Sequence, residues 1–314
     1  MIPNYPFKPV ANLDLLAKML GITRQELDFL YHNSDNFFFL HSRTKKNDGS
    51  YRDIYNVKKR LKIIHGRIVN IFLKHVYFPT YLHGSLKNRD FLTNINNHVG
   101  KKILITEDIT NFFPSISKKI VFEVWVSFFK FSKEVSEYLA ELITFKGYLV
   151  QGGKTSSYIG NLILWSRERE LVDSLAKKGF KYTRYVDDIT VSANRIITSK
   201  EKTEIIKCIY QLLKSVGVKP NRSKHQIMPR NKKQTIHNLN VNQNIASMNK
   251  KKRQMIRAAI FECERKFQID PTSEEYLILY NRTLGRVNHI KRIHPKIGNI
   301  LQKQLKLIKP QNIL

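Results

Sequence analysis

The sequence predicts an α+β fold in which antiparallel strands pack with helices and an all-helical segment follows. Residues 37–57 and 182–192 are each predicted to be a strand pair, because β-branched and aromatic residues flank a short polar turn. Apolar residues recur at helical spacing in residues 58–74 and around 205–216. With 314 residues, 42% of them hydrophobic, the chain can bury a core divided into two or three subdomains.

Two short helices are expected at the start of the chain. Asn12 can cap the first helix, and Gly21 would end it. Thr23 and Glu26 have the spacing of a capping box for the second helix. These helices are expected to be a packing unit without a function of their own.

A basic hairpin and a helix are expected next. The hairpin of residues 37–57 would turn at Asn47, Asp48 and Gly49. The helix of residues 58–74 has apolar side chains on one face, with Lys and Arg between them: Leu61, Ile64, Ile68, Ile71 and Phe72.

The central segment is expected to alternate between strand, helix and loop. A strand at residues 103–105 would bring Asp108 close to its end, and Pro114 is expected to end any regular structure. Residues 121–145 have the periodicity of one or two helices. A glycine-punctuated loop, residues 147–157, and a helical run at residues 158–177 follow.

The stretch TRYVDDITVS places two adjacent carboxylates among strand-forming residues. If strands cover residues 182–186 and 189–192, Asp187 and Asp188 form the two-residue turn between them. Their mutual repulsion favours a bound cation, and Asp108 at the end of another strand can complete a carboxylate cage for Mg²⁺. Two such ions would activate a 3′ hydroxyl and stabilise leaving pyrophosphate. The alternative is an ordinary polar hairpin turn.

The remaining elements are predicted from the same signals. A helix of about twenty residues is expected around residues 205–216, with strands near Gln226 and Asn238. From Ile245 onward the chain carries fifteen Lys or Arg against five Asp or Glu and is expected to be helical. One apolar face would point inward there: Ile256, Ile260, Cys263 and Phe267.

The charge of the chain points to a polyanionic partner. The formal net charge of +30 attracts nucleic acid, with a membrane surface or the ribosome as the alternatives. Cys208 and Cys263 are too few for a disulfide framework or a zinc finger, which fits a reducing cytoplasm. Asp14 and Lys18 interrupt the apolar stretch near the N-terminus, so it is expected to be neither a signal peptide nor a membrane span, and no membrane is predicted among the partners.

The order of the motifs resembles the reverse transcriptases, and within them the retron-type enzymes of bacteria. EDITNFFPSI, LVQGGKTSSYIGNL, YVDD and GVKPNRSKH follow one another as in that family, and the likeness covers roughly residues 37–296. It implies a right-hand polymerase fold. Its parts would be an N-terminal helical segment (1–36), fingers (37–100, with part of 140–165), a palm with an antiparallel sheet (101–243) and a basic helical thumb (244–314).

The resemblance also implies roles for individual residues. Asp108 and Asp187 would hold two Mg²⁺ ions, with Asp188 beside them, and Ile109 is added as a metal-contacting position. Phe113 matches the steric gate that excludes a nucleotide 2′ hydroxyl. The other nucleotide-binding residues would be Arg52, Phe112, Gln151 and Lys224.

Further residues are assigned to nucleic acid. Asn94 to His98 fits the NAxxH element of retron enzymes. Where those enzymes usually carry Val-Thr-Gly, this chain has Ile236-His237-Asn238, and Val150, Gly153 and Lys154 also depart from the usual pocket motif. The candidate contacts are Asn94, His98, His237, Asn238, Lys250, Lys251, Lys252, Arg253 and Arg257.

The function implied is RNA-directed DNA synthesis. By resemblance, deoxynucleotides are the substrates, and a specific non-coding RNA is the template. A 2′ hydroxyl of that RNA is the primer, so that the product is a branched, RNA-linked DNA. The same resemblance implies an effector protein as partner and a role in antiphage defence. Three alternatives remain: another bacterial reverse transcriptase (group II intron-like or diversity-generating), an RNA-dependent RNA polymerase, and a non-catalytic RNA-binding scaffold.

Overall fold

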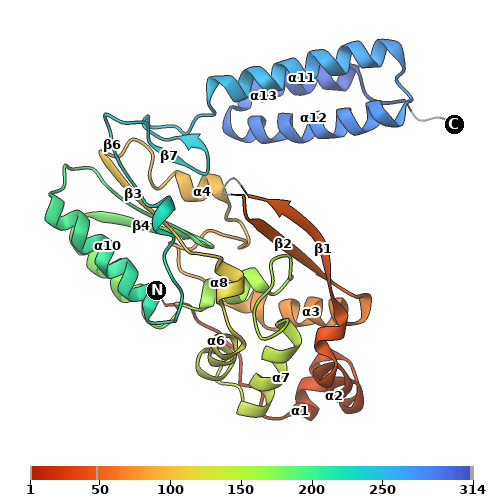
Figure 1. Cartoon of the computed structure of the whole chain (residues 1–314), viewed down its shortest axis with the longest axis vertical. Coiled ribbons are helices and arrows are strands. Elements are labelled where there is room, and N and C mark those ends of the chain that lie inside the picture. Colours follow the sequence, from red (N-terminus) through yellow and green to blue (C-terminus); the bar gives the residue numbers. More distant parts are fainter. Residues whose placement is uncertain (1, 47–48, 312–314) are drawn as a thin grey trace. The chain divides into compact units, whose positions relative to one another are not determined.

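The computed structural model describes residues 2–46 and 49–311, and the chain divides into two compact units (Figure 1). The first consists of residues 1–94 and 102–227, and the second of residues 95–101 and 228–314. Each unit is described by itself. The finer division into fingers, palm and thumb stays a prediction.

The first unit opens with the two predicted helices, α1 (Leu13–Leu20) and α2 (Arg24–His32). The Asn12 side chain accepts the Leu15 N–H at 2.9 Å, and Gly21 ends α1 in the left-handed region at φ 63°. The Thr23 hydroxyl caps α2 by accepting the Glu26 N–H, whereas the Glu26 carboxylate accepts from Arg60 at 2.8 Å. Both helices are therefore confirmed.

The predicted hairpin is formed by β1 (Phe38–Lys45) and β2 (Tyr51–Val57), which pair antiparallel. The expected tip residues Asn47 and Asp48 lie outside the described residues. After a 3₁₀ turn, Ser34–Phe37, before the hairpin, the chain continues through α3 (Lys59–Ile71) and a second 3₁₀ turn, Leu73–His75. Tyr55 of β2 donates its N–H to the Gln151 carbonyl at 2.8 Å, which fixes the hairpin to the glycine loop.

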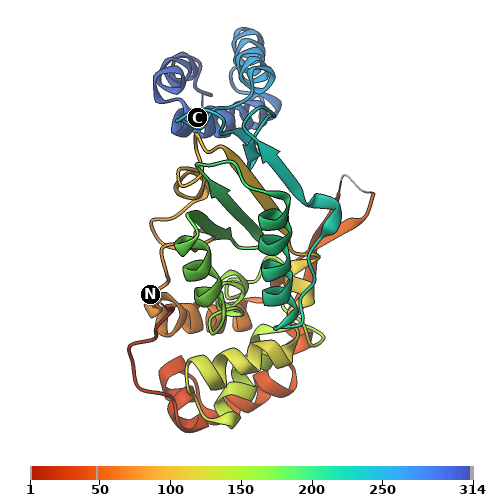
Figure 2. The same ribbon diagram turned by 90° about the vertical axis from the view of Figure 1, so that its left-hand side faces the viewer.

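The central sheet has four strands in the order β4-β5-β3-β6. These strands are β3 (Ile103–Asp108), β4 (Phe180–Tyr185), β5 (Asp188–Ala193) and β6 (Gln226–Pro229). Both neighbours of β5 run antiparallel to it. The helices α9 (Glu168–Lys177) and α10 (Ser199–Lys214) pack against each other beside the sheet in both views (Figure 1, Figure 2).

Two expectations for the central segment are wrong. Pro114 does not end regular structure, because it lies inside a one-turn helix, α5 (Phe112–Ser115), where the first N–H groups have no intrahelical partner and a proline costs little. The expected helical run at residues 158–177 is two helices, α8 (Ser156–Leu162) and α9, joined by a turn at residues 163–167. The segment before them forms α6 (Lys118–Glu123), a π-helical turn (Val124–Phe128) and α7 (Lys133–Ile143), as expected.

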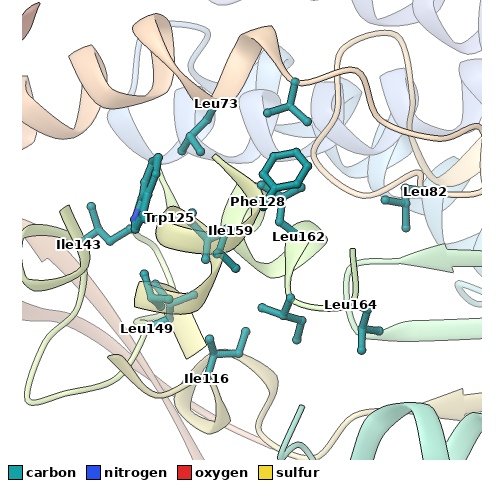
Figure 3. Close-up of a cluster of buried hydrophobic side chains, with 14 of the residues drawn as sticks. Leu73, Leu82, Ile116, Trp125, Phe128, Ile143, Leu149, Ile159, Leu162 and Leu164 are labelled. Carbon is teal, nitrogen blue, oxygen red and sulfur yellow. The ribbon is translucent and has the colours of Figure 1, made fainter. Parts of the chain in front are cut away.

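The core of the first unit is built around aromatic side chains. Trp125 is fully buried, and its ring packs against Phe129 at a centroid distance of 4.6 Å. Figure 3 shows how helices and loops from several parts of the chain contribute to this cluster, with Leu73, Trp125, Phe128, Ile159 and Leu162 side by side. Because α8 supplies two of these buried side chains, the glycine loop that precedes it leads into a helix that is held in the core.

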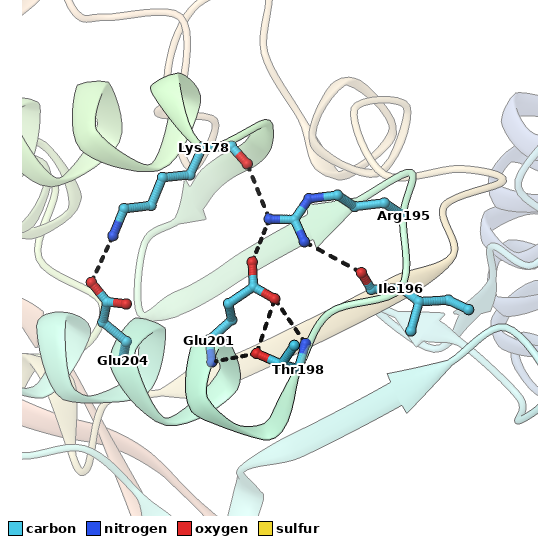
Figure 4. A network of polar contacts seen from close by, with 6 residues as sticks. All are labelled: Lys178, Arg195, Ile196, Thr198, Glu201 and Glu204. Carbon is cyan, nitrogen blue, oxygen red and sulfur yellow. Dashed lines mark hydrogen bonds and ion pairs between the residues drawn. The ribbon is translucent and has the colours of Figure 1, made fainter.

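The start of α10 is fixed by a polar network that the sequence analysis did not identify (Figure 4). Thr198 and Glu201 form a reciprocal capping box, and Arg195 donates to the Glu201 carboxylate. Lys178 at the end of α9 pairs with Glu204 of α10 at 2.6 Å. The helix spans 16 residues and is therefore shorter than expected.

The second unit contains a two-stranded hairpin and three helices. The hairpin strands are β7 (Thr235–Ile236) and β8 (Leu239–Asn240), and the helices are α11 (Lys250–Ile269), α12 (Glu274–Ile293) and α13 (Pro295–Leu307). The strands expected near Gln226 and Asn238 are confirmed by β6 and by this hairpin, whose turn is formed by His237 and Asn238 with φ of 49° and 62°. The predicted apolar stripe of α11 is confirmed: Ile256, Ile260 and Cys263 are buried, and Phe267 is half-buried.

The short helix α4 (Phe91–Ile95) lies at the boundary between the units in the sequence. Among the described residues, no helix is both long enough and apolar enough to cross a bilayer.

Candidate active site

The two adjacent aspartates lie where β4 turns into β5, but the turn comes one residue earlier than predicted. Tyr185 pairs with Asp188 in the register, so the two turn residues are Val186 and Asp187. Asp188 is the first residue of β5. Val186 has a φ of 59°, a region that a β-branched residue rarely occupies, so tertiary contacts must impose this turn.

The third carboxylate is brought alongside by strand pairing. Asp108 is the last residue of β3 and lies directly opposite Asp188 on β5. Asn221 holds Asp108 through two contacts: its N–H donates to the Asp108 carbonyl at 2.7 Å, and its side-chain amide donates to Asp108 Oδ2 at 3.1 Å. Lys224 Nζ lies 3.1 Å from the same oxygen. The structure therefore brings together Asp108, Asp187, Asp188 and Lys224.

The carboxylates share a partly dehydrated, negatively charged environment. Burial, followed by the charge of Asp108, raises the pKa of Asp187. Burial and the charges of Asp187 and Asp108 raise the pKa of Asp188 to about 7. Lys224 opposes both shifts but does not cancel them. The site therefore stabilises an added positive charge.

This arrangement fits a hard divalent cation. Within residues 2–46 and 49–311, no three His, Cys, Asp or Glu side chains already stand in a metal-binding arrangement. The donors that meet here are nevertheless all carboxylate oxygens, which Mg²⁺ prefers, and they lie beside an open cavity. A cation bound between Asp108 and Asp187 would replace the Lys224 ammonium as the counter-charge of Asp108.

A cavity of about 920 Å³ opens at the carboxylates. It is large enough for a nucleoside triphosphate, since typical ligand pockets range from about 300 to 1,000 Å³. The residues that sequence reasoning assigned to metal and nucleotide all line it: Arg52, Asp108, Ile109, Phe112, Phe113, Gln151, Asp187, Asp188 and Lys224. The residues that were assigned to nucleic acid are not among those that line this cavity.

The paired phenylalanines take different places at this cavity. Phe112 is buried and Phe113 is half-buried, with ring centroids 5.2 Å apart. Gly160 of α8 lies behind them, and a Cβ there would come within 2.8 Å of the Phe112 ring. The pair is thus packed from behind, which leaves Phe113 as the ring with solvent-accessible surface.

A buried ion pair beneath the β4–β5 turn was missed by sequence reasoning. Arg184 of β4 and Glu168 of α9 are both fully buried and contact each other through two hydrogen bonds, of 2.6 and 2.9 Å. Arg184 also donates to the Val186 carbonyl at 3.0 Å, and to the carbonyls of Gly160 and Asn161 at the end of α8. It therefore links the turn that carries Asp187 to the helix behind the phenylalanines.

The segment before α4 supports the same turn. His83 donates its N–H to the Arg184 carbonyl at 2.9 Å, and the Asn161 amide donates to the Gly84 carbonyl at 2.8 Å. A Cβ on Gly84 would overlap the Val186 side chain and lie 2.6 Å from its backbone nitrogen. Glycine is thus required at position 84 for the close approach of two backbones.

A second buried contact lies on the other face of β3. Glu107 is fully buried, and its carboxylate contacts His225 Nδ1 at 2.6 Å and the Tyr210 hydroxyl at 3.4 Å. Burial raises the pKa of Glu107 in spite of these partners. Because His225 follows the 3₁₀ turn Arg222–Lys224, this contact helps to fix Lys224 beside Asp108.

The residues assigned to nucleic acid are found in other places. Asn94 and His98 are fully buried, which leaves no surface for a direct contact with nucleic acid in this structure. Their assignment to nucleic acid stays a prediction. His237 and Asn238 form the β7–β8 turn, and burial lowers the pKa of His237 to about 4. The basic residues lie on α11, where Arg253 is half-buried and the others are exposed: Lys250, Lys251, Lys252 and Arg257.

The chain is similar to known proteins over most of its length. A family model described as reverse transcriptase (RNA-dependent DNA polymerase) matches residues 44–254. The Retron Se72 reverse transcriptase of Salmonella heidelberg (strain 579083-10) is 34% identical over 98% of this chain and 80% of its own length. The Retron Ec48 reverse transcriptase of Escherichia coli is 31% identical over 96% of this chain and 77% of its own. A solved telomerase from Candida albicans aligns with 81% of this chain and 51% of its own at 10% identity and a TM-score of 0.43.

The family model covers 211 of 314 residues, including the three carboxylates and the cavity around them. The chain therefore belongs to the reverse transcriptases, a class of RNA-directed DNA polymerases with a right-hand α+β fold that depend on divalent metal ions. Within that class it is a retron-type enzyme, because relatives of that kind match nearly its whole length. RNA is accordingly its template.

Proposed function

We propose that this chain copies one structured non-coding RNA into DNA, using two Mg²⁺ ions held by Asp108 and Asp187. The observation that carries the proposal is the meeting of Asp108, Asp187 and Asp188 from two paired strands at one cavity. Asp188, whose pKa is raised to about 7, supports the two ligands from the adjacent position, and Ile109 is the proposed metal-contacting backbone position. When bound, the ions activate the attacking hydroxyl and stabilise the pyrophosphate.

Deoxynucleoside triphosphates are the proposed substrates. Arg52 and Lys224 line the same cavity as the carboxylates and can neutralise the triphosphate. Gln151 and Phe112 line the wall between them. Phe113 is the proposed steric gate, because its half-buried ring lies at the cavity wall, where it can clash with the 2′ hydroxyl of a ribonucleotide.

The proposed RNA contacts lie outside this cavity. The α11 residues Lys250, Lys251, Lys252, Arg253 and Arg257 put several positive charges on one helix, and opposing a helix dipole with cations is favourable only near a polyanion. His237 and Asn238 are proposed to contact RNA as well. The same is proposed for Asn94 and His98, which are fully buried and would have to become exposed to do so.

The retron relatives suggest the rest of the reaction. We propose that a 2′ hydroxyl of the template RNA primes synthesis, so that the product is a branched, RNA-linked single-stranded DNA. We also propose a bacterial cytoplasmic setting, an effector protein as a partner and a role in antiphage defence. These proposals rest on the likeness to retron reverse transcriptases.

The first test replaces one metal ligand. Asp187→Asn keeps the size of the side chain but removes its charge, so we expect it to abolish deoxynucleotide incorporation and to leave RNA binding within about twofold of wild type. Asp173→Asn is the matched control, since Asp173 is a solvent-exposed partner of Arg169 on α9, away from the cavity. Incorporation by purified protein is measured with labelled deoxynucleotide. Unchanged synthesis by Asp187→Asn would refute the assignment.

The other candidate functions make different predictions. If Phe113 is a gate, Phe113→Ala should admit ribonucleotides and leave deoxynucleotide incorporation measurable. A wild-type enzyme that already prefers ribonucleotides would instead support an RNA polymerase. A scaffold would copurify with RNA but no DNA when the chain is expressed with its native flanking DNA. DNA that shortens after RNase treatment and is absent from Asp187→Asn would support an RNA-primed retron enzyme over the intron-like and diversity-generating types.

A further inference from the structure

The second unit contains a cavity that is separate from the carboxylate site. Its volume is about 630 Å³, and its walls are the β7–β8 turn, one face of α11 and one face of α12. All of its lining residues belong to the second unit. A cavity of this size can hold one nucleotide, since typical ligand pockets range from about 300 to 1,000 Å³.

The charges around the cavity have one sign. Arg282 and Arg286 follow each other at helical spacing on α12, and Lys252 faces the same space from α11. None of the described residues that line the cavity is acidic. Three cations without a lining counter-charge favour a ligand that carries phosphate, and Arg can bind phosphate through two parallel hydrogen bonds.

The floor of the cavity is apolar. Leu239, Met248 and Ile256 are buried in the second unit, and Met255 beside them is 57% exposed. A methionine side chain adapts its shape to a flat ring and contacts it through a polarisable sulfur. The cavity therefore combines a phosphate-binding rim with a surface on which a planar, weakly polar group can lie.

Gly285 leaves the α12 side of the cavity open. It lies inside the 20-residue helix α12, where glycine costs about 1 kcal/mol relative to alanine. A Cβ at this exposed position would meet no heavy atom of residues 2–46 and 49–311 within 4 Å, and the φ of Gly285 does not lie in the left-handed region. By contrast, a Cβ on Gly298 of α13 would overlap the backbone of Lys291, so that glycine serves helix packing. Gly285 serves no packing purpose in the unit but lines the cavity.

The turn at the mouth of the cavity supplies groups that can recognise a base. His237 and Asn238 present polar side chains next to the apolar floor. Since burial lowers the pKa of His237 to about 4, its imidazole is neutral at pH 7 and has one donor and one acceptor nitrogen. Asn238 adds an amide, which also donates and accepts.

We propose that this cavity binds a single unpaired nucleotide of the template RNA, with its base against Met255 and Ile256 and its phosphates on Lys252, Arg282 and Arg286. The inference rests on the proposed function, which supplies a structured RNA as the template. A fully paired helix would offer phosphates to the rim but no base to the floor, so the cavity selects an RNA in which one nucleotide has left the stack. Gly285 leaves the space that the nucleotide occupies.

The test compares two RNA probes that differ in one nucleotide. The probes are a fluorescent RNA hairpin with a single bulged uridine and the same hairpin without the bulge, and binding to the full chain is followed by anisotropy at fixed salt. We expect wild type to prefer the bulged probe. Gly285→Leu fills the space, so it should weaken binding of the bulged probe on the order of tenfold and leave the paired probe within about twofold, as expected for losing one base contact.

Two matched variants separate this effect from folding. Gly285→Ala should raise the Tm, because it removes a glycine from the inside of a helix. It should nevertheless weaken binding of the bulged probe. Gly66→Ala is the control for stability, since Gly66 lies inside α3 with only Lys154 Nζ near its Cβ position, at 3.9 Å. Asn281→Leu is the control for adding a leucine to an exposed position of α12 outside the cavity. Both controls should bind the two probes as wild type does.

The possible outcomes are distinct. Equal binding of the two probes by wild type, or Gly285→Leu binding both as wild type does, overturns the proposal. A DNA hairpin with the same bulge that binds as tightly as the RNA probe and is equally weakened by Gly285→Leu would overturn the RNA assignment. Incorporation on a preannealed template and primer is measured in parallel for each variant. If wild type fails there, the proposed polymerase function fails while the probe comparison still decides the cavity.

Discussion

Glu168→Gln removes the charge that compensates Arg184 inside the first unit. Both side chains are fully buried, and Glu168 also accepts from the Tyr182 hydroxyl at 2.8 Å. Breaking a buried ion pair by neutralising one partner costs about 3–5 kcal/mol, because the other charge stays buried. Glutamine keeps one acceptor oxygen for Arg184, so we expect the lower end, about 3 kcal/mol. The first unit has 220 residues (94 + 126), for which this loss lowers the Tm by roughly 6–12 °C.

The assay can follow the first unit alone. Trp125 and Trp165 are the two tryptophans of the chain, and both belong to that unit, so urea unfolding is read from their fluorescence. Glu170→Gln is the matched control: Glu170 lies two residues away on the same helix and is exposed. We expect Glu170→Gln to unfold as wild type does and Glu168→Gln at a clearly lower urea concentration. If the two variants unfold at the same urea concentration, the buried ion pair does not stabilise the first unit as the structure implies.

Two further predictions test other buried positions. Burial lowers the pKa of His65 from 6.5 to about 4, so its neutral form contributes stability that is complete above pH 6.5 and is lost as the pH falls towards 4, up to about 3 kcal/mol. Glutamine cannot titrate in this range but can donate to the Leu142 carbonyl, so His65→Gln should lose less stability than wild type between pH 7 and pH 4.5, as measured by urea unfolding. If the free energy of unfolding falls equally with pH in both proteins, the pKa shift of His65 is contradicted. Gly84→Ala forces a Cβ into the Val186 side chain and backbone, so we expect incorporation to fall by more than about tenfold while tryptophan fluorescence stays that of a folded unit. Wild-type activity of Gly84→Ala would show that the turn tolerates displacement.

The sequence predicted the elements whose signals are local. The cap at Asn12, the hairpin of β1 and β2, and the strand that ends at Asp108 follow from spacing and turn chemistry, and the structure confirms them. The residues that line the cavity at the carboxylates were predicted as a set because the order of motifs along the chain is itself informative. Pro114 was misjudged because a one-turn helix has no hydrogen bond for a proline to break.

The contacts that hold the site together could not be predicted in this way. Glu107 and His225 are 118 residues apart, and Arg184 meets Glu168 through the packing of α9 on the sheet. One signal was available for Arg184: an arginine between Thr183 and Tyr185 stands inside a strand that is otherwise suited to burial, and a buried arginine requires a partner. The identity of that partner depends on the fold.

The shifted turn shows why local propensity failed at the most important position. Two aspartates are a better turn sequence than Val-Asp, so propensity alone places Asp187 and Asp188 in the turn. In the structure Asp188 instead pairs with Asp108 across the sheet, and Val186 adopts a positive φ, at a cost on the order of 1–3 kcal/mol. Three features outside the turn hold it in this form: the hydrogen bond from Arg184 to the Val186 carbonyl, the missing Cβ of Gly84, and the register of β3 with β5. The strained conformation of Val186 therefore places Asp187 on the same side as Asp108. Variants that let Val186 adopt a relaxed conformation should lose activity before they lose the fold.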